Sequence, residues 1–221
     1  KENGYKVVKR AMALGEVTAG QICLAVAGTH GKTTTSTLVA HILTEGTKGC
    51  SAFLRGISRN YGTNMLMSHT PTVVVEADEF DRSFLQLHPA IALITAMDAD
   101  HLDIYGTHEE YCKAFRQFAG KVTRKLIIKK GLPVSGQDTK ARIMTYSFDD
   151  ARADFHAENL RLDKSGHFTY DLVCPQGMVK DIKVGTIGWV NVENSVAAAA
   201  IALTYGVEPA AIRRAIGSFQ G

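Results

Sequence analysis

The sequence has little of what marks a nucleic-acid-binding, membrane-spanning or zinc-binding protein. Its 25 basic and 22 acidic residues leave a net charge of only +3, and no basic run suggests a nucleic-acid surface. No apolar stretch is long enough to span a bilayer, and the first residues do not resemble a signal peptide. The four cysteines include no Cys-x-x-Cys pair, which disfavours a zinc site. We therefore expect a cytoplasmic protein with free thiols and without nucleic-acid or membrane partners.

Internal repeats and low-complexity tracts are also absent. The 221 residues, 45% hydrophobic and 21% charged, are typical of a soluble globular protein, and we predict a single domain over residues 1–221. Helical patterns lie close to both ends of the sequence. Because the sequence begins just before one helical pattern and ends just after another, we predict that the chain is a piece of a longer protein.

The most informative stretch joins a short apolar run, residues 22–27, to a helical pattern at residues 34–43. A strand that turns through glycines into a helix makes an anion site, because open backbone N–H groups and the helix dipole point at the ligand. Lys32 adds a full charge, and the Thr33 hydroxyl suits a Mg²⁺ ion beside phosphates. The stretch predicts a P-loop in which Val26 replaces the first glycine of the full pattern; the alternative is an ordinary glycine-rich turn. The residues concerned are Gly28, Thr29, His30, Gly31, Lys32, Thr33 and Thr34.

Polar residues follow two further apolar runs, residues 72–77 and 90–95. Ligands of open α/β sheets bind at the carboxyl ends of parallel strands, and acidic side chains there usually hold Mg²⁺ when a P-loop is near. Glu76 is thus a candidate metal ligand, whereas helix capping is the alternative for it and for the acids that follow. His101 is chemically suited to act as a base or to hydrogen-bond a carboxylate, and a structural role is equally open.

The remaining patterns predict the fold class. Two alternating runs around a turn predict an antiparallel hairpin, and residues 55–62 form either a binding loop or a plain surface loop. The whole predicts an α/β fold, a P-loop-containing and mostly parallel sheet flanked by helices, with an additional small antiparallel β layer. The expected helices are 5–14, 34–43, 109–118, 191–205 and 209–216, and the expected strands are 22–27, 53–54, 72–77, 90–95, 125–128, 143–146, 157–162, 168–173 and 179–184.

Four motifs together resemble the Mur ligase family, in order and over essentially the whole chain. The resemblance implies the central ATP-binding domain of a three-domain enzyme, whose N-terminal UDP-binding domain and C-terminal domain are missing from this chain. The isolated chain is then expected not to turn over. The motifs are Gly28-Thr29-His30-Gly31-Lys32-Thr33-Thr34, Glu76-Ala77-Asp78-Glu79, Asp100-His101-Leu102-Asp103 and Asn191-x-x-Asn194.

The resemblance also implies a reaction and roles for its residues. The reaction is ATP-dependent amide formation in peptidoglycan precursor synthesis, through an acyl phosphate. By this resemblance Lys32 and the loop neutralise the β- and γ-phosphates, Thr33 and Glu76 hold one Mg²⁺ ion, and Glu76 and His101 hold a second. Lys32, Glu76 and His101 form the implied catalytic set. Asn191 and Asn194 would contact adenine, whose edge an amide matches.

Within the family, the sequence is most similar to the branch that joins L-alanine to UDP-N-acetylmuramate. Many relatives outside that branch carry a modified lysine where Phe115 stands. Val190 and Ala96 replace residues that are common in the family, a histidine and an asparagine. The alternatives are the branch that joins a whole peptide to UDP-N-acetylmuramate, and a nucleotide-binding module without ligase chemistry.

Overall fold

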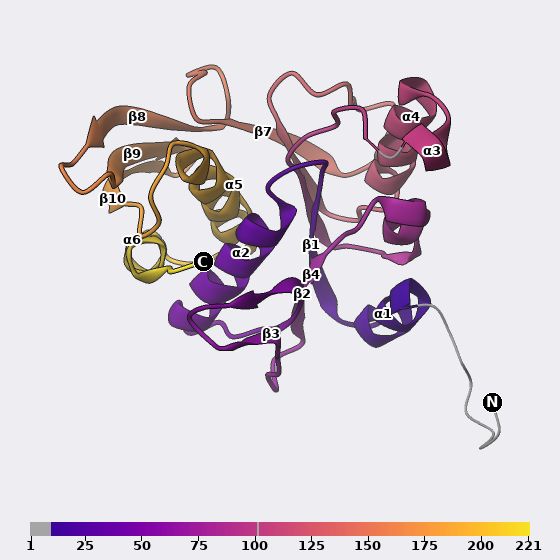
Figure 1. The fold of residues 1–221 in the computed structure, drawn as a ribbon, viewed down its shortest axis with the longest axis horizontal. Coiled ribbons are helices and arrows are strands. Elements are labelled where there is room, and N and C mark those ends of the chain that lie inside the picture. Colours follow the sequence, from indigo (N-terminus) through magenta and orange to yellow (C-terminus); the bar gives the residue numbers. More distant parts are fainter. Residues whose placement is uncertain (1–9, 101) are drawn as a thin grey trace.

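A computed structural model of the protein describes residues 10–100 and 102–221, and it is built around one ten-stranded sheet (Figure 1). The strand order is β10-β9-β8-β7-β6-β5-β1-β4-β2-β3. The strands are β1 (Ile22–Ala27), β2 (Ser51–Ser58), β3 (Thr63–Leu66), β4 (Thr72–Glu76), β5 (Ile91–Ile94), β6 (Lys125–Lys129), β7 (Arg142–Ser147), β8 (Phe155–Leu162), β9 (Phe168–Cys174) and β10 (Gly177–Lys183). The helices are α1 (Arg10–Thr18), α2 (Lys32–Glu45), the 3₁₀ helix η1 (Phe80–Gln86), α3 (Leu102–Tyr105), α4 (His108–Ala119), α5 (Val190–Tyr205) and α6 (Pro209–Ser218).

Helices cover both faces of the central strands. In the part of the sheet ordered β8-β7-β6-β5-β1-β4-β2, all neighbouring strands pair in parallel. Strands β4 and β5 are buried along their whole length. Strands buried on both faces are continuous apolar runs rather than alternating ones, which is the pattern the sequence shows there. One core lies between the sheet and α2, α5 and α6, and a second lies on the opposite face, under α4 and η1.

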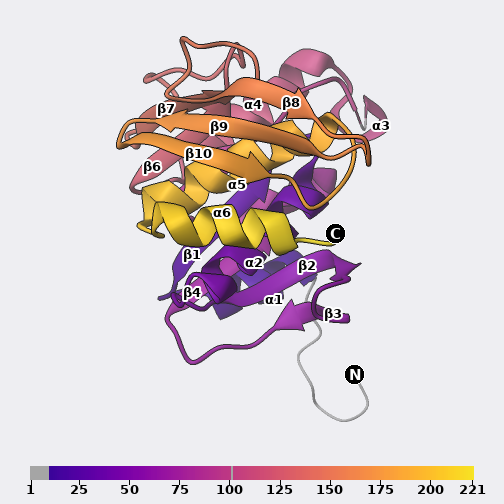
Figure 2. The same cartoon turned by 90° about the vertical axis from the view of Figure 1, so that its left-hand side faces the viewer.

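The antiparallel strands continue the main sheet. Tyr146 of β7 pairs in parallel with Phe155 of β8, and β8, β9 and β10 then pair antiparallel. This edge curls over α5 and α6 (Figure 2), and the hydroxyl groups of Tyr170 and Ser195 lie 2.9 Å apart between β9 and α5. The predicted fold class is confirmed. The antiparallel strands β8, β9 and β10 form one edge of the sheet, and β3 pairs antiparallel with β2 at the opposite edge.

Most predicted elements are confirmed within a few residues, and two predictions are wrong. The first predicted helix, residues 5–14, does not end at residue 14, because α1 continues to Thr18; residues 5–9 of that prediction lie outside the described part. A Cβ atom at Gly15 would lie 2.8 Å from the carbonyl oxygen of Gln86, so this glycine permits a close approach of two backbones. Residues 55–62 are not one loop, because the first four of them belong to β2.

No helix within residues 10–100 and 102–221 is long and apolar enough to cross a membrane. All four cysteines are free and buried, at positions 23, 50, 112 and 174. Cys23 lies within β1 and is buried, as is typical of a free cysteine that packs as a small core residue.

Candidate functional site

The carboxyl ends of β1, β4 and β5, where the sequence predicts the polar site residues, lie side by side in the sheet. Strand β1 lies between β4 and β5, with Val26 opposite Glu76 and Ala27 opposite Ile94. The loop after β1 therefore passes between the ends of its two neighbours. A cavity follows this loop and is lined by Thr29, His30, Gly31, Lys32, Thr33, Thr34, Arg55 and Glu76.

Two glycines give the loop its shape. Gly28 has φ +134° and Gly31 has φ +78°, and both values lie in the region that favours glycine. A Cβ atom at Gly28 would lie 2.1 Å from Thr95 Oγ1, so the loop approaches the end of β5 more closely than any side chain permits. Gly28 thus makes the turn directly after β1, where Val26 stands in place of an earlier glycine.

Replacing Gly31 with alanine should destabilise the chain by more than its backbone strain alone. A Cβ atom there would lie 2.7 Å from Asn194 Oδ1, in addition to a left-handed strain of about 1–2 kcal/mol. Gly20 is a matched control, because its φ is +79° and nothing lies within 4 Å of its Cβ position. Urea unfolding of both alanine variants measures the difference; equal losses of stability would show that the contact with Asn194 is unimportant.

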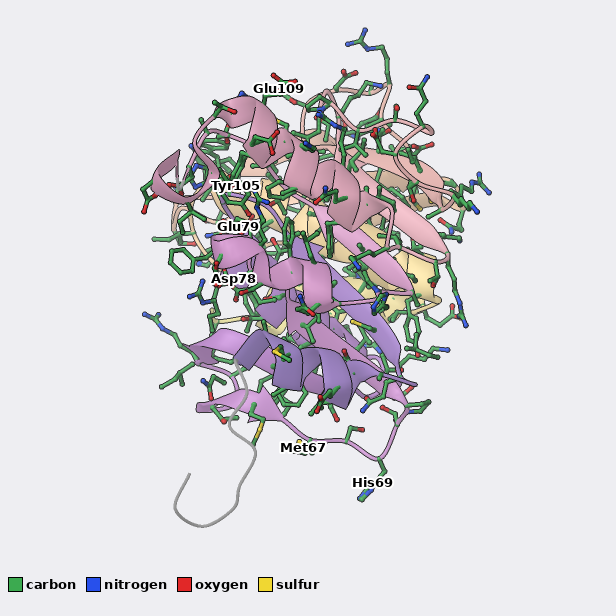
Figure 3. All side chains as sticks on the ribbon, turned by 90° about the vertical axis from the view of Figure 1, so that its right-hand side faces the viewer. Met67, His69, Asp78, Glu79, Tyr105 and Glu109 are labelled. Atoms are coloured by element: carbon green, nitrogen blue, oxygen red, sulfur yellow. The ribbon has the colours of Figure 1, made fainter. Side chains whose placement is uncertain are left out.

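Lys32 forms an ion pair that the sequence did not predict. Its Nζ lies 2.9 Å from Glu79 Oε1 and also donates to the carbonyl oxygen of Gly28, at 2.6 Å. Glu79 is only 1% exposed, and the hydroxyl of Tyr105 donates to its backbone carbonyl. Asp78, Glu79 and Tyr105 lie beside one another in Figure 3. The ammonium group is thereby fixed at the start of α2.

Glu76 joins the loop to strand β2. Its Oε1 accepts the hydroxyl proton of Thr33 at 3.0 Å, and its Oε2 accepts the backbone N–H of Arg55 at 3.3 Å. Burial raises the pKa of this carboxyl, and the hydrogen bonds from Thr33 and Arg55, together with the charges of Lys32 and Arg55, oppose that rise. A carboxylate and a hydroxyl oxygen in contact are of the type that Mg²⁺ prefers.

The predicted metal site is sparse in protein ligands. Within the described residues, no group of three or more histidine, cysteine, aspartate or glutamate side chains could hold a metal ion. Mg²⁺ commonly takes one or two protein oxygens and completes its shell with phosphates and water, so Thr33 and Glu76 fit such an ion. His101 lies outside the described residues, and its role stays a prediction.

The predicted adenine residues lie on the other side of the loop. Asn194 Nδ2 donates to Asn191 Oδ1 at 3.3 Å, and Thr35 Oγ1 donates to Asn194 Oδ1 at 3.4 Å. Asn194 and Val190 line a separate cavity on this side of the loop, whereas the Asn191 amide donates to the carbonyl of Ile187. The sequence analysis missed other residues of that cavity, among them Lys129, Tyr146, Trp189 and Glu193.

The remaining loop residues differ in their surroundings. Thr29 Oγ1 donates to the carbonyl of Asp98 at 3.1 Å and lies 3.0 Å from the Tyr111 hydroxyl, so its side chain secures the loop. The His30 side chain is largely exposed and lies 3.9 Å from Asp98. Thr34 lines the P-loop cavity.

Comparison with known families identifies this arrangement. The family described as Mur ligase middle domain matches residues 26–202, which include the P-loop, Glu76 and both asparagines. The chain belongs to the Mur ligase middle domain family. The resemblance predicted from the four motifs is confirmed.

Individual Mur ligases resemble the chain to different degrees. It is 45% identical to UDP-N-acetylmuramate–L-alanine ligase from Phocaeicola vulgatus over the whole chain and 48% of that protein. It is 47% identical to the enzyme of that name from Porphyromonas gingivalis, over the whole chain and 49% of that protein. The chain thus spans about half the length of these relatives. A solved structure of UDP-N-acetylmuramate:L-alanyl-gamma-D-glutamyl-meso-diaminopimelate ligase from Neisseria meningitides has a TM-score of 0.85 and 22% identity, over the whole chain and 73% of that structure.

Proposed function

We propose that the chain is the central ATP-binding domain of an enzyme that joins L-alanine to the carboxylate of UDP-N-acetylmuramate. The observation that carries this proposal is the contact of the buried Glu76 with Thr33 of the P-loop, in a chain of the Mur ligase middle domain family. The names of the relatives at 45–47% identity support the two substrates. This activity belongs to peptidoglycan precursor synthesis, in the cytoplasm.

The reaction requires two anions to meet. A carboxylate oxygen of UDP-N-acetylmuramate attacks the γ-phosphorus of ATP, and ADP leaves. The amino nitrogen of L-alanine then attacks the acyl carbon, inorganic phosphate leaves, and the amine loses a proton. Positive charge must offset the repulsion between carboxylate and phosphate, and fixed cations and N–H donors do this without reorganising.

The P-loop supplies that charge. Lys32 and the backbone N–H groups after Gly28 lie at the start of α2 and would bind the β- and γ-phosphates. Thr33 and Glu76 would hold Mg²⁺, and Glu76 with His101 would hold a second ion. Bound Mg²⁺ would offset negative charge on the phosphate oxygens.

The cavity beside Asn194 is the proposed adenine site. Asn194 lies against Gly31 and therefore joins the phosphate loop to the base. An amide offers both a donor and an acceptor to the edge of adenine, and Asn191 orients Asn194 through their 3.3 Å hydrogen bond.

We propose further that residues 1–221 form one domain and that the catalytic unit is larger than this chain. The relatives are about twice as long, so the UDP portion and L-alanine would bind chiefly outside residues 1–221. The isolated chain is then expected to be inactive.

An assay of ADP release by the full-length protein tests the proposal. With UDP-N-acetylmuramate and ATP present, L-alanine should support turnover and a tripeptide should not. Product mass would confirm that one alanine has been added. Turnover with the tripeptide alone would assign the protein to peptide joining, and no turnover with either would refute the ligase proposal.

A further inference from the structure

Two neighbouring cavities share part of their lining. The first is the P-loop cavity described above. The second lies beside α1 and η1, next to Arg55 of β2 and the end of β4. Among the described residues, Arg55 and Glu76 line both cavities. Ligands in the two cavities would therefore meet at these two side chains. The second cavity is lined by Ala11, Leu14, Arg55, Glu76, Asp78, Ser83, Phe84 and Leu87.

The two cations near this boundary differ in their freedom to reach a ligand. The Lys32 side chain is 11% exposed, and its ammonium group contacts Glu79 and backbone carbonyls. The Arg55 side chain is 49% exposed. Its backbone is held by the hydrogen bond to Glu76 Oε2, so the side chain extends from a fixed position on β2. Of the described residues that line the second cavity, Arg55 is the only one with a positive side chain.

Asp78 shows which chemistry suits this guanidinium. Its Oδ2 lies 3.1 Å from Arg55 Nη1, so a carboxylate already occupies one position on the arginine, at the edge of the second cavity. A guanidinium has five N–H donors in a planar fork that matches a carboxylate. A substrate carboxylate can bind the same fork, by displacing Asp78 or by using other donors.

We propose that Arg55 binds the carboxylate of the acceptor substrate in the second cavity and holds it toward the γ-phosphate in the P-loop cavity. This inference rests on the proposed function, because it places the second anion of that reaction. Arg55 is a positioning residue here: it orients the attacking oxygen, while Lys32 remains with the phosphates. Its charge offsets the repulsion between the two anions.

Steady-state kinetics of the full-length protein separate this role from a general structural one. Arg55→Ala should raise the KM for UDP-N-acetylmuramate by about 10- to 100-fold, the effect of a lost charge-assisted hydrogen bond. The KM for ATP should change less than about twofold, since Lys32 and the loop remain. Arg55→Lys keeps the charge without the fork and should recover part of the loss.

Two further variants sharpen the test. Asp78→Asn keeps an oxygen that can accept the Phe80 N–H, as Asp78 Oδ1 does at 3.2 Å, but it removes the competing charge, so the KM for UDP-N-acetylmuramate should fall. Arg161 is a matched control at the antiparallel edge, because it is 53% exposed and pairs with Asp181 at 3.0 Å. Arg161→Ala should leave both KM values unchanged.

The outcomes distinguish this inference from the proposed function. If the wild-type protein ligates but Arg55→Ala leaves the KM for UDP-N-acetylmuramate unchanged, or raises both KM values equally, the role of Arg55 is refuted alone. A higher KM for UDP-N-acetylmuramate in Asp78→Asn would refute it as well. If the wild-type protein does not ligate, the proposed function fails and this inference fails with it.

Discussion

Replacing Lys32 with alanine should abolish ADP release by the full-length enzyme, with a loss of about 10³-fold or more. The ammonium group is the charge on the P-loop itself, and it is held at the start of α2 by Glu79 and the carbonyl of Gly28. A neutral side chain leaves the γ-phosphate without this charge as negative charge shifts toward the leaving ADP. ADP release at saturating ATP measures the loss, and normal turnover would refute the P-loop assignment.

The ion pair with Glu79 makes a stability control necessary. Removing Lys32 leaves the carboxylate of Glu79, 1% exposed, without the ammonium group at 2.9 Å. Breaking such a buried pair costs about 3–5 kcal/mol. Lys32→Ala combined with Glu79→Gln should recover most of that stability, because no buried charge loses its counterion, but it should not recover ADP release. Recovery of turnover in the double variant would show that Lys32 acts only through the fold.

Replacing Glu76 with glutamine should lower kcat by about 10²–10³-fold and raise the Mg²⁺ concentration needed for half of the maximal rate. The carboxylate contacts both the Thr33 hydroxyl and the Arg55 N–H, and the amide keeps the size of the side chain while it removes the charge that favours a cation. Asp171→Asn is a control, because Asp171 is also buried but belongs to the antiparallel edge. It should leave the Mg²⁺ dependence unchanged; an equal shift in both variants would refute a metal role for Glu76.

The two carboxyls should also have opposite effects on stability as the pH changes. Burial raises the pKa of Glu76, so the folded state binds its proton more tightly than the unfolded state. That contribution is fully present below the ordinary pKa of 4.5 and is lost as the pH rises through the raised value. Hydrogen bonds, first from the Asp181 N–H and then from Asn159, lower the pKa of Asp171, so its contribution is present above its ordinary value and is lost as the pH falls.

Unfolding of the metal-free chain across this pH range measures both contributions. The stability of Glu76→Gln relative to wild type should rise as the pH passes upward through the raised pKa. For Asp171→Asn, the relative stability should fall as the pH rises through the depressed pKa. A constant difference for Glu76→Gln would contradict the raised pKa.

Local patterns were sufficient for most of the fold. The buried runs of β1, β4 and β5 have no alternation, and such runs indicate parallel strands whatever their neighbours. The glycines and Lys32 indicate an anion site because helix N-termini act through local backbone geometry. The end of the first helix and the loop over residues 55–62 were wrongly predicted because they depend on contacts with other segments. Gly15 lies against the Gln86 carbonyl, the Arg55 N–H bonds to Glu76 at the end of β4, and Ser58 pairs with Thr63 of β3.

The sequence by itself determined the glycine-containing loop between β1 and α2, the parallel strands and the acids near their ends, because each depends on residues close together in the chain. Only the tertiary structure decided which groups each acid contacts. Glu79 forms an ion pair with Lys32, and Glu76 accepts hydrogen bonds from Thr33 and Arg55. Glu76 is the last residue of β4 and Glu79 lies just before η1, so neighbouring strands and the turn into η1 set the directions of the two side chains. The arginine at the boundary of the two cavities was likewise visible only after β2 had been placed beside β4.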